Sequence, residues 1–285
     1  METNNALGEY LRARRELVQP ADVGLEVSGA GHRRVPGLRR EEVAMLAGIS
    51  SDYYLRLEQG RDSHPSTQVL DAIARVLQLN PEASAYLFEL ANPKPPRARR
   101  RRAERVPEGI LVMLDAIDMP AFVEGKYTDV LAVNRMATAL IPTIVPGGNR
   151  LRSTFLDPVE QEFFEDWEKG TEGVVAALRA RAAGQLDDPR LVSLIGELSL
   201  RSDRFRRLWA RHDIRRIEGS MTAVNHPQVG RMELYREKLV LAAADGLVMV
   251  VYHAHPGTES ERLLQLLASA TLPAARAGAP SRVVP

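Results

Sequence analysis

The chain has 285 residues, of which 45% are apolar, and its formal net charge is +1. This length is sufficient for two domains, each with its own core. The absence of cysteine excludes disulfide bonds and thiolate-bound zinc. No apolar run follows a basic N-terminal start, and the longest apolar stretches, such as Gly246–Tyr252, fall far short of the roughly 20 residues that span a bilayer. These features predict a soluble cytoplasmic protein with no membrane segment.

Charge is unevenly distributed along the chain. Residues 1–91 hold 10 basic and 13 acidic side chains, whereas residues 92–107 hold 7 basic side chains and 1 acidic one. Residues 108–285 hold 21 basic and 23 acidic side chains. Because neither large segment is broadly cationic, affinity for nucleic acid must depend on the local placement of a few basic groups.

Residues 1–91 carry the pattern of a helical domain. Periodic apolar residues predict helices over Leu7–Leu17, Ser66–Leu77 and Pro81–Leu90. Between the first two, residues 40–60 read REEVAMLAGISSDYYLRLEQG and have the spacing of a helix-turn-helix. Gly48 suits the positive φ of the turn, and Ser50 can cap the second motif helix. The positions expected to face inward are all apolar or small: Val43, Ala44, Ala47, Ile49, Tyr54 and Leu57.

The outward face of the second motif helix favours DNA recognition over a purely structural hairpin, which would bury a similar inner stripe. Ser51, Asp52, Leu55 and Arg56 project from its first turns, where such a helix meets base edges in the major groove. Arginine suits bidentate bonding to guanine, while Asp52 either accepts from a cytosine amino group or orients Arg56. The residues predicted to contact DNA are Arg39, Arg40, Ser50, Ser51, Asp52, Tyr53, Leu55, Arg56 and Arg61.

The segment Pro36–Arg61, PGLRREEVAMLAGISSDYYLRLEQGR, resembles the XRE family of λ-repressor-like regulators. The resemblance implies an all-α five-helix DNA-binding domain, a phosphate contact for Arg40, and base-reading roles for Ser51, Asp52 and Arg56. The preceding connection, Pro20–Pro36, is longer than usual for this family. Its Arg33 and Arg34 either reach the DNA backbone or a minor groove, or lie in a solvated surface loop.

Residues 92–107, NPKPPRARRRRAERVP, mark a boundary between domains. Their prolines disfavour helix, and Arg97 and Arg99–Arg102 repel one another and stay solvated. This segment is either a plain linker or an arm that neutralises backbone phosphates and steepens the salt dependence of binding. Its place directly after the DNA-binding domain favours the arm.

Beyond Pro107 the pattern becomes a mixture of helices and strands. Helices are predicted over Glu108–Asp118, Asn134–Leu140, Pro158–Gly184, Asp188–Leu200, Ser202–Arg211 and Thr258–Ala270. Two strands are predicted within Ala121–Val133, followed by Arg215–Val224, Gly230–Leu241 and Leu247–His253. Residues 108–271 therefore predict an α+β sheet with helices over one face, the plan of a PAS-like domain. Residues 272–285 lack periodicity and are predicted to be a disordered tail.

Three segments resemble the ligand-binding domain of MmyB-like regulators, which accompanies this type of XRE domain: DVLAVNRMA (Asp129–Ala137), DDPRLVSLIGELSLRSDRFRRLWARHDI (Asp187–Ile214) and HPQVGRMEL (His226–Leu234). The resemblance implies a PAS-like pocket for a fatty acid or other acyl-type molecule. An elongated apolar ligand needs an aromatic and aliphatic lining with a polar anchor. The predicted lining is Phe122, Phe163, Trp167, Phe205 and Trp209, and the predicted anchor for a carboxylate is Asn134, His212, His226 or a nearby arginine. The alternative is that these residues form the core and cap turns, because the aromatic pairs are spaced one helical turn apart.

An enzyme is a weaker hypothesis. His253 and His255, with His226 and Glu233, could in principle ligate a metal, but His255 lies at a strand end and no second closely spaced ligand pair follows. No phosphate loop, nucleophile elbow or paired-carboxylate signature is present. The sequence therefore predicts a regulator that is not an enzyme and holds no metal or cofactor.

The predicted regulator binds double-stranded DNA as a homodimer, with half-sites about 34–36 Å apart, and responds to a small apolar ligand. The alternative is a constitutive DNA-binding regulator whose C-terminal domain serves only dimerisation or protein docking.

Overall fold

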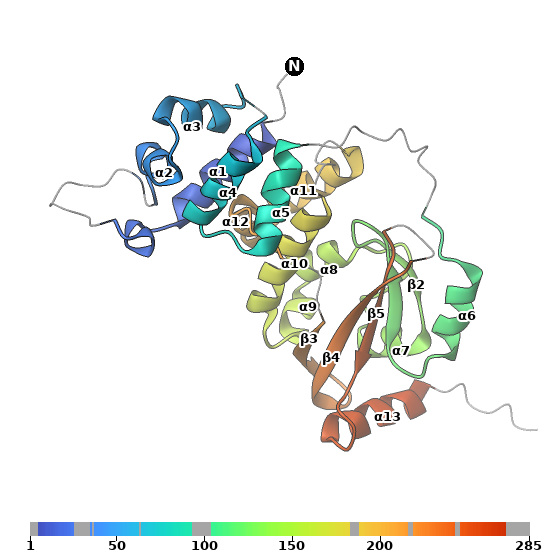
Figure 1. The fold of residues 1–285 in the computed structure, drawn as a ribbon. Coiled ribbons are helices and arrows are strands. Elements are labelled where there is room, and N and C mark those ends of the chain that lie inside the picture. The colour runs from blue at the N-terminus through green and yellow to red at the C-terminus, as the bar shows by residue number, and fades with distance from the viewer. Residues whose placement is uncertain are drawn as a thin grey trace, which may run out of the picture. The chain divides into compact units, whose positions relative to one another are not determined.

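A computed structural model describes residues 5–25, 35, 37–62, 64–92, 104–182, 188–215, 219–242 and 246–271. The chain divides into two compact units (Figure 1). The N-terminal unit comprises Met1–Arg101 and Glu168–Ile217, and the sheet unit comprises Arg102–Trp167 and Glu218–Pro285. The basic run Arg97–Arg102 of the predicted phosphate arm, the predicted tail and the loop arginines Arg33 and Arg34 lie outside the described residues.

The N-terminal unit begins with the helices that the sequence predicts, together with a short 3-10 helix that it does not. In chain order they are α1 (Ala6–Leu17), η1 (Pro20–Val23), α2 (Arg40–Ala47), α3 (Ser51–Glu58), α4 (Thr67–Val76) and α5 (Pro81–Ala91). The side chains of Asn5, Ser50, Ser66 and Asn80 each accept a hydrogen bond from an amide in the first turn of the helix that follows. These caps satisfy donors that a helix start leaves unpaired, which is why the helices begin where they do.

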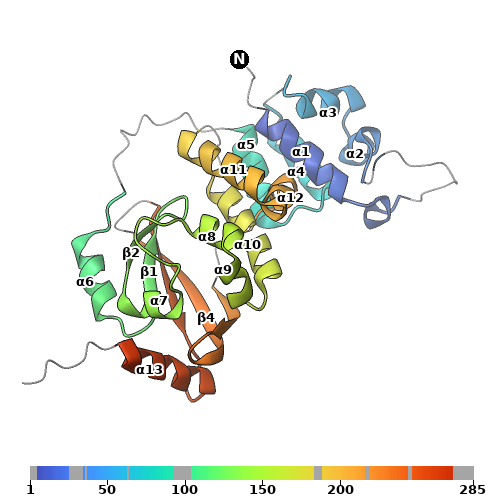
Figure 2. The same cartoon turned by 180° about the vertical axis from the view of Figure 1, so that it is seen from behind.

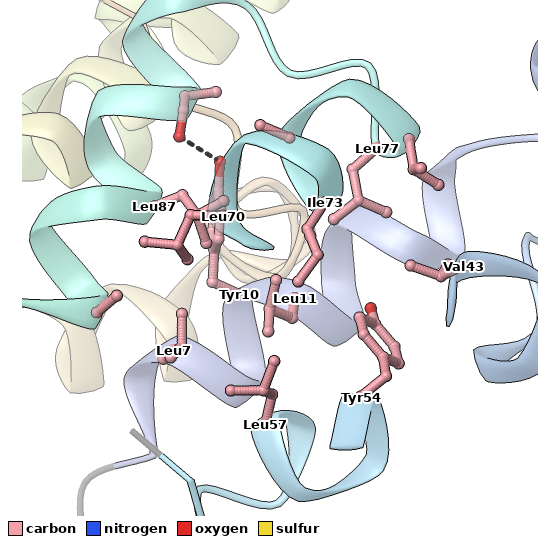
Figure 3. Packing of buried hydrophobic residues seen from close by; sticks show 14 of the residues in the cluster. Leu7, Tyr10, Leu11, Val43, Tyr54, Leu57, Leu70, Ile73, Leu77 and Leu87 are labelled. Carbon is pink, nitrogen blue, oxygen red and sulfur yellow. Dashed lines mark hydrogen bonds between the residues drawn. The ribbon is translucent and has the colours of Figure 1, made fainter. Parts of the chain in front are cut away.

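A single apolar core joins these helices (Figure 3). Tyr10 and Leu11 of α1 lie at its centre with no exposed surface, and the Tyr10 hydroxyl donates to the Ala83 carbonyl oxygen at 3.1 Å. Val43, Ala44, Tyr54 and Leu57 of the motif are buried, while Ala47 and Ile49 are partly buried against the same core. The inward face predicted for the helix-turn-helix is therefore confirmed.

Three further helices belong to the N-terminal unit: α10 (Trp167–Arg181), α11 (Pro189–Arg201) and α12 (Asp203–Ala210). We call them the inserted helices, because in sequence they lie between two parts of the sheet unit. Ile214, just after α12, is buried in the same core as the DNA-binding helices, and Ala180 of α10 packs against it. The N-terminal unit thus holds more than the five expected helices, although residues 168–217 fall within the 108–271 domain that the sequence predicts.

The sheet unit contains five antiparallel strands in the order β2-β1-β5-β4-β3. They are β1 (Ala121–Glu124), β2 (Val130–Val133), β3 (Ser220–His226), β4 (Gly230–Val240) and β5 (Val248–His253). All five strands are predicted from the sequence, but β3 begins five residues later than expected. The helix predicted over Pro158–Gly184 is interrupted after α9 (Pro158–Phe163), where Phe164 forms a bridge to Val224 of β3.

Helices cover both faces of this sheet (Figures 1 and 2). On one face, α7 (Arg135–Leu140), α9 and α13 (Glu259–Thr271) pack on Phe122, Val248 and Val250. On the other, α6 (Glu108–Ala116) packs Leu114 on Ala121, Val123, Met249 and Val251. A short helix that the sequence did not predict, α8 (Arg150–Leu156), precedes α9.

The expectation of helices over one face is therefore wrong. β1 and β5 are buried along nearly their whole length, so both of their faces need a cover. Within the described part of the chain, no helix combines the length and apolar character that crossing a membrane requires.

Candidate DNA interface and ligand-binding residues

The turn between α2 and α3 fixes how α3 is presented. Gly48 ends α2 with a φ of 69°, in the left-handed region that glycine adopts without strain. The Ser50 hydroxyl oxygen accepts from the Tyr53 amide at 3.1 Å and caps α3. Because Tyr54 and Leu57 on the inner side are fully buried, the opposite face of α3 is held toward solvent on a rigid support.

The exposed face of α3 carries the residues predicted to read bases. Ser51, Asp52 and Arg56 are exposed, and Leu55 is partly exposed. The Arg56 guanidinium donates to Asp52 and lies 5.7 Å from the centre of the Tyr53 ring. The structure thus shows the arrangement in which Asp52 orients Arg56. Exposed pairs of this kind contribute less than about 1 kcal/mol, so exchanging this contact for one to a base edge costs little.

A buried ion cluster supports α3 from behind. The Glu58 carboxylate, whose side chain is 3% exposed, accepts from Arg15 Nε and from Arg40 Nε, both at 2.6 Å. Arg15 also donates to the Leu38 carbonyl oxygen at 2.7 Å. Burial alone would lower the pKa of Arg15, but its hydrogen bond to Glu58 and the charge of Glu58 outweigh burial and raise the pKa. The cluster ties together α1, the start of α2 and the end of α3.

The remaining predicted DNA contacts surround α3. Arg39 and Arg61 are exposed, and the backbone N–H of Arg39 donates to Glu42 Oε2 at 2.6 Å. The Arg40 side chain remains 43% exposed despite its bond to Glu58. Ser50 is exposed and serves as the α3 cap. Seven of the nine predicted residues lie on α3 or within three residues of its ends, Arg40 at the start of α2 reaches Glu58 of α3, and Arg39 is the N-cap of α2. Their contacts to DNA stay predictions.

The predicted ligand-binding residues are divided between the two units. The sheet unit holds Phe122, Asn134, Phe163, Trp167 and His226, whereas the N-terminal unit holds Phe205, Trp209 and His212. A surface hollow in the N-terminal unit, between α4 and α5, is bordered by none of them. Their roles toward a ligand stay predictions, and their contacts within the fold are as follows.

Asn134 is a hub of hydrogen bonds in the sheet unit. Its Oδ1 accepts from the amides of Ala121 at 3.0 Å and Ala137 at 2.9 Å. Its Nδ2 donates to the carbonyl oxygens of Leu114, Ile117 and Met119 at 2.8–3.3 Å. The side chain thus caps α7, as predicted, and fastens the chain between α6 and β1. These contacts occupy the amide fully, so Asn134 works as a structural clamp.

Phe163, Trp167 and His226 are likewise held by neighbours. The His226 Nδ1 accepts from the amides of Gln228 and Val229, so the proton of a neutral ring is on Nε2, which donates to the Ala139 carbonyl oxygen at 3.0 Å. Phe163 lies edge-on to His226, with ring centres 6.3 Å apart, and belongs to the same core as Phe122. The Trp167 indole N–H donates to the Thr154 carbonyl oxygen at 2.8 Å.

The other three residues surround an arginine that sequence reasoning missed. Phe205 and Trp209 of α12 stack with ring centres 5.9 Å apart, and Arg179 of α10 lies 3.8 Å from the centre of the Trp209 ring. His212 follows α12 with a φ of 53° and contacts the Tyr10 ring at 6.2 Å between centres. No sequence pattern distinguishes Arg179 from Arg181, the other arginine of α10.

A second group missed from the sequence is a basic cluster inside the sheet unit. Arg150 makes a two-pronged ion pair with Glu160, and Lys238 donates to Glu124 at 3.2 Å. Arg236 donates to the Ser220 hydroxyl at 2.9 Å, while its buried Nε has no hydrogen-bond partner within the described residues. Burial raises the pKa of Tyr252, and the charges of Arg236 and Arg150 oppose that rise. Three basic groups thus face two carboxylates. The signal was present in the sequence, because Arg236 and Lys238 follow Met232 and Leu234 on the inward-facing side of β4.

The histidines considered as metal ligands lie elsewhere. His253 stacks on Tyr235 with ring centres 5.1 Å apart and lies 4.0 Å from Glu237. His255 is exposed and contacts the Pro256 carbonyl oxygen. Across the residues that the structure describes, no three histidine or acidic side chains are grouped so that they could hold a metal ion.

Taken together, the two crossed helices and the exposed face of α3 define a helix-turn-helix DNA-binding protein. Comparison with family models agrees: a helix-turn-helix domain matches residues 6–87, and the ligand-binding domain of MmyB-like transcription regulators matches residues 106–267. Because the second match covers more than half of the chain, the protein belongs to the MmyB-like transcription regulators. It is a DNA-binding transcription regulator with a ligand-binding domain. The comparison with curated proteins found no match.

Proposed function

We propose that this regulator reads a palindromic operator as a homodimer, through Ser51, Asp52 and Arg56 of α3, and that an acyl-type carboxylate ligand controls the binding. The main support is the rigid presentation of α3, with a buried inner side, a capped start and an exposed polar outer face. Two such helices in successive major grooves need half-sites about 34–36 Å apart. The XRE assignment and the cytoplasmic location stay predictions.

The basic cluster of the sheet unit supports a carboxylate ligand. Arg150 and Lys238 have carboxylate partners in Glu160 and Glu124. Among the residues that the structure describes, Arg236 donates to the Ser220 hydroxyl alone, and its buried Nε has no partner. An arginine with spare donors in a low-dielectric site binds a carboxylate by charge-assisted hydrogen bonds. The apolar side chains around Phe122 and Val250, on one face of the sheet, would contact the acyl chain of such a ligand. Arg236 therefore replaces Asn134 and His226 as the proposed anchor.

The operator is tested by selecting bound duplexes from a random library. A palindrome with two half-sites one helical turn apart is the expected result. A single unrepeated half-site would contradict the homodimer.

The ligand is tested by organic extraction of the purified protein and by calorimetric titration with palmitate. We expect Arg236→Met to weaken palmitate binding about 10-fold or more, because the lost bonds are charge-assisted. The matched control is Arg231→Met on the same strand, since Arg231 is exposed and paired with Glu165 and Glu233. Equal affinities for both variants would contradict the anchor. The absence of any bound or bindable acyl chain would favour the constitutive regulator.

A further inference from the structure

The inserted helices lie against the DNA-binding helices through a polar cluster. Arg179 of α10 is 2% exposed, and its guanidinium donates to the Trp209 carbonyl oxygen and lies over the Trp209 ring. Tyr10 of α1 packs edge-on against Tyr86 of α5, with ring centres 5.1 Å apart, and Tyr86 is hydrogen-bonded to Arg179. At the rim, Arg14 of α1 donates to Asp213 at 2.8 Å. This surface therefore joins α1 and α5 to α10 and to the chain after α12.

The cluster is unusual for a contact that only holds a fold together. Arg179 has no carboxylate among its hydrogen-bond partners within the described residues, and burial lowers its pKa. The Nε atoms of Arg14 and Arg179 and the Nδ1 of His212 are buried without a hydrogen-bond partner in the described structure. Buried polar groups that lack partners cost free energy. Within the described residues this surface holds three such atoms, whereas the core around Leu11 and Leu57 holds one, the Tyr54 hydroxyl. The polar surface therefore costs less to separate than the apolar core beside it.

The inserted helices are connected to the sheet unit at both of their ends. α10 begins at Trp167, whose indole is fastened to Thr154 of the sheet unit, and the chain re-enters the sheet unit before β3 begins at Ser220. Docking on α1 and α5 leaves Ser51, Asp52 and Arg56 of α3 exposed. The inserted helices therefore do not block the DNA-reading face. Both ends of the inserted segment continue into the sheet unit, so its contact with α1 and α5 is a non-covalent link in addition to the covalent link of residues 92–107.

We propose that the α1–α5 surface is a releasable docking site for the chain's own inserted helices, and that docking sets the affinity for the operator. The proposal rests on the DNA-binding function proposed above and adds the element through which that function is regulated. The docked state holds the DNA-binding helices in one orientation to the chain that enters the sheet. Undocking leaves residues 92–107 as the remaining link between α1–α5 and the rest of the chain, so the two α3 helices of a dimer lose their preorganised spacing.

The test uses the full chain and a matched pair of substitutions. Ile214→Asp places a carboxylate in the apolar part of the docking surface, where Ile214 is 5% exposed. Leu200→Asp, on the inserted helix α11, makes the same change at a side chain that is 85% exposed. Since the chain has no cysteine, spin labels can be attached at Arg12→Cys on α1 and Arg207→Cys on α12, both exposed positions. Double electron–electron resonance spectroscopy then measures the distance between the two labels, which reports docking. A titration with the selected duplex measures the affinity for DNA.

We expect Ile214→Asp to broaden the distance distribution and to weaken binding of the duplex about 5-fold or more, while Leu200→Asp changes neither. An unchanged distance distribution in Ile214→Asp would overturn the docking site. A broadened distribution with unchanged affinity would overturn its control of DNA binding. Failure of both Asp variants and the wild type to bind any selected duplex would instead contradict the proposed function, because the distance measurement needs no DNA.

Discussion

The ion cluster behind α3 allows a prediction about the stability of the DNA-binding helices. Glu58→Gln removes the negative charge between Arg15 and Arg40 with almost no change of volume. The side chains of Arg15 and Glu58 are only 4% and 3% exposed, so Arg15 keeps a buried charge whose remaining carboxylate neighbour, Glu16, lies 4.0 Å away and is 40% exposed. Breaking one partner of a buried pair costs about 3–5 kcal/mol. The matched control is Glu197→Gln in the same unit, whose partner Arg201 is 61% exposed, and we expect a cost below about 1 kcal/mol there.

Native-state hydrogen exchange measures this cost, because it reads the opening free energy of single amides without requiring the two units to unfold together. The amides to follow are those of Leu11, Val43 and Leu57, which lie in the core that the cluster supports. The double variant Arg15→Met with Glu58→Leu should recover most of the loss, since an apolar pair of similar size avoids the burial of charge. A loss below about 1 kcal/mol for Glu58→Gln would refute the reasoning.

Three other predictions follow from single features. Deletion of Arg97–Arg102 should reduce the steepness of log affinity against log salt concentration by about 4–5, because five phosphate contacts are lost. An unchanged slope would contradict the proposed contact of this segment with DNA phosphates. Burial and the charges of Arg179 and Arg14 lower the pKa of His212 from 6.5 to about 3. Above pH 6.5 the ring is neutral whether docked or undocked, and as the pH falls the undocked ring takes up a proton first, so docking weakens, by at most about 2 kcal/mol at pH 5. Tyr10 faces this ring and Asp213 adjoins it, and both are titratable. The control is therefore His212→Asn, which keeps these two residues and should abolish the pH dependence of the spin-label distance. Asn134→Ala should cost about 2–4 kcal/mol of sheet-unit stability by hydrogen exchange, and a loss of palmitate affinity without that cost would restore Asn134 as an anchor.

The helix-turn-helix was predictable because its information is local. Ser50 and Asn134 cap the helices they precede, and Gly48 ends α2 with a positive φ, as their residue types indicate. The inward stripe of Val43, Tyr54 and Leu57 follows from helical periodicity alone. Arg56 is then expected to be exposed, because Tyr54 and Leu57 place the opposite face of α3 in the core.

The grouping of the inserted helices was not predictable in the same way. Periodicity shows that α10 and α12 have an apolar side, but it does not show what covers that side. In the structure Ala180 and Ile214 pack on the DNA-binding core, far away in the sequence. The break between α9 and α10 likewise depends on the pairing of Phe164 with Val224, a contact sixty residues apart.

The ligand-binding predictions show the limit of reasoning from residue type. Aromatic residues and histidines were chosen because they are common in pockets, yet Phe205, Trp209 and His212 belong to the docking cluster of the N-terminal unit. The more informative feature was Arg236, a basic residue on the inward side of a strand. An unpaired buried donor is recognised only when its surroundings are known.

Base reading by the outer face of α3 is measured by comparing the DNA sequences that two arginine variants select. Arg56→Ala removes the exposed guanidinium of α3, whereas Arg75→Ala removes an exposed arginine of α4 and the same charge. We expect Arg56→Ala to lose the preference at one base pair of each half-site and to weaken the free energy of binding by about 1–3 kcal/mol. Arg75→Ala should keep the wild-type preference. Identical selected sequences for the wild type and Arg56→Ala would contradict it.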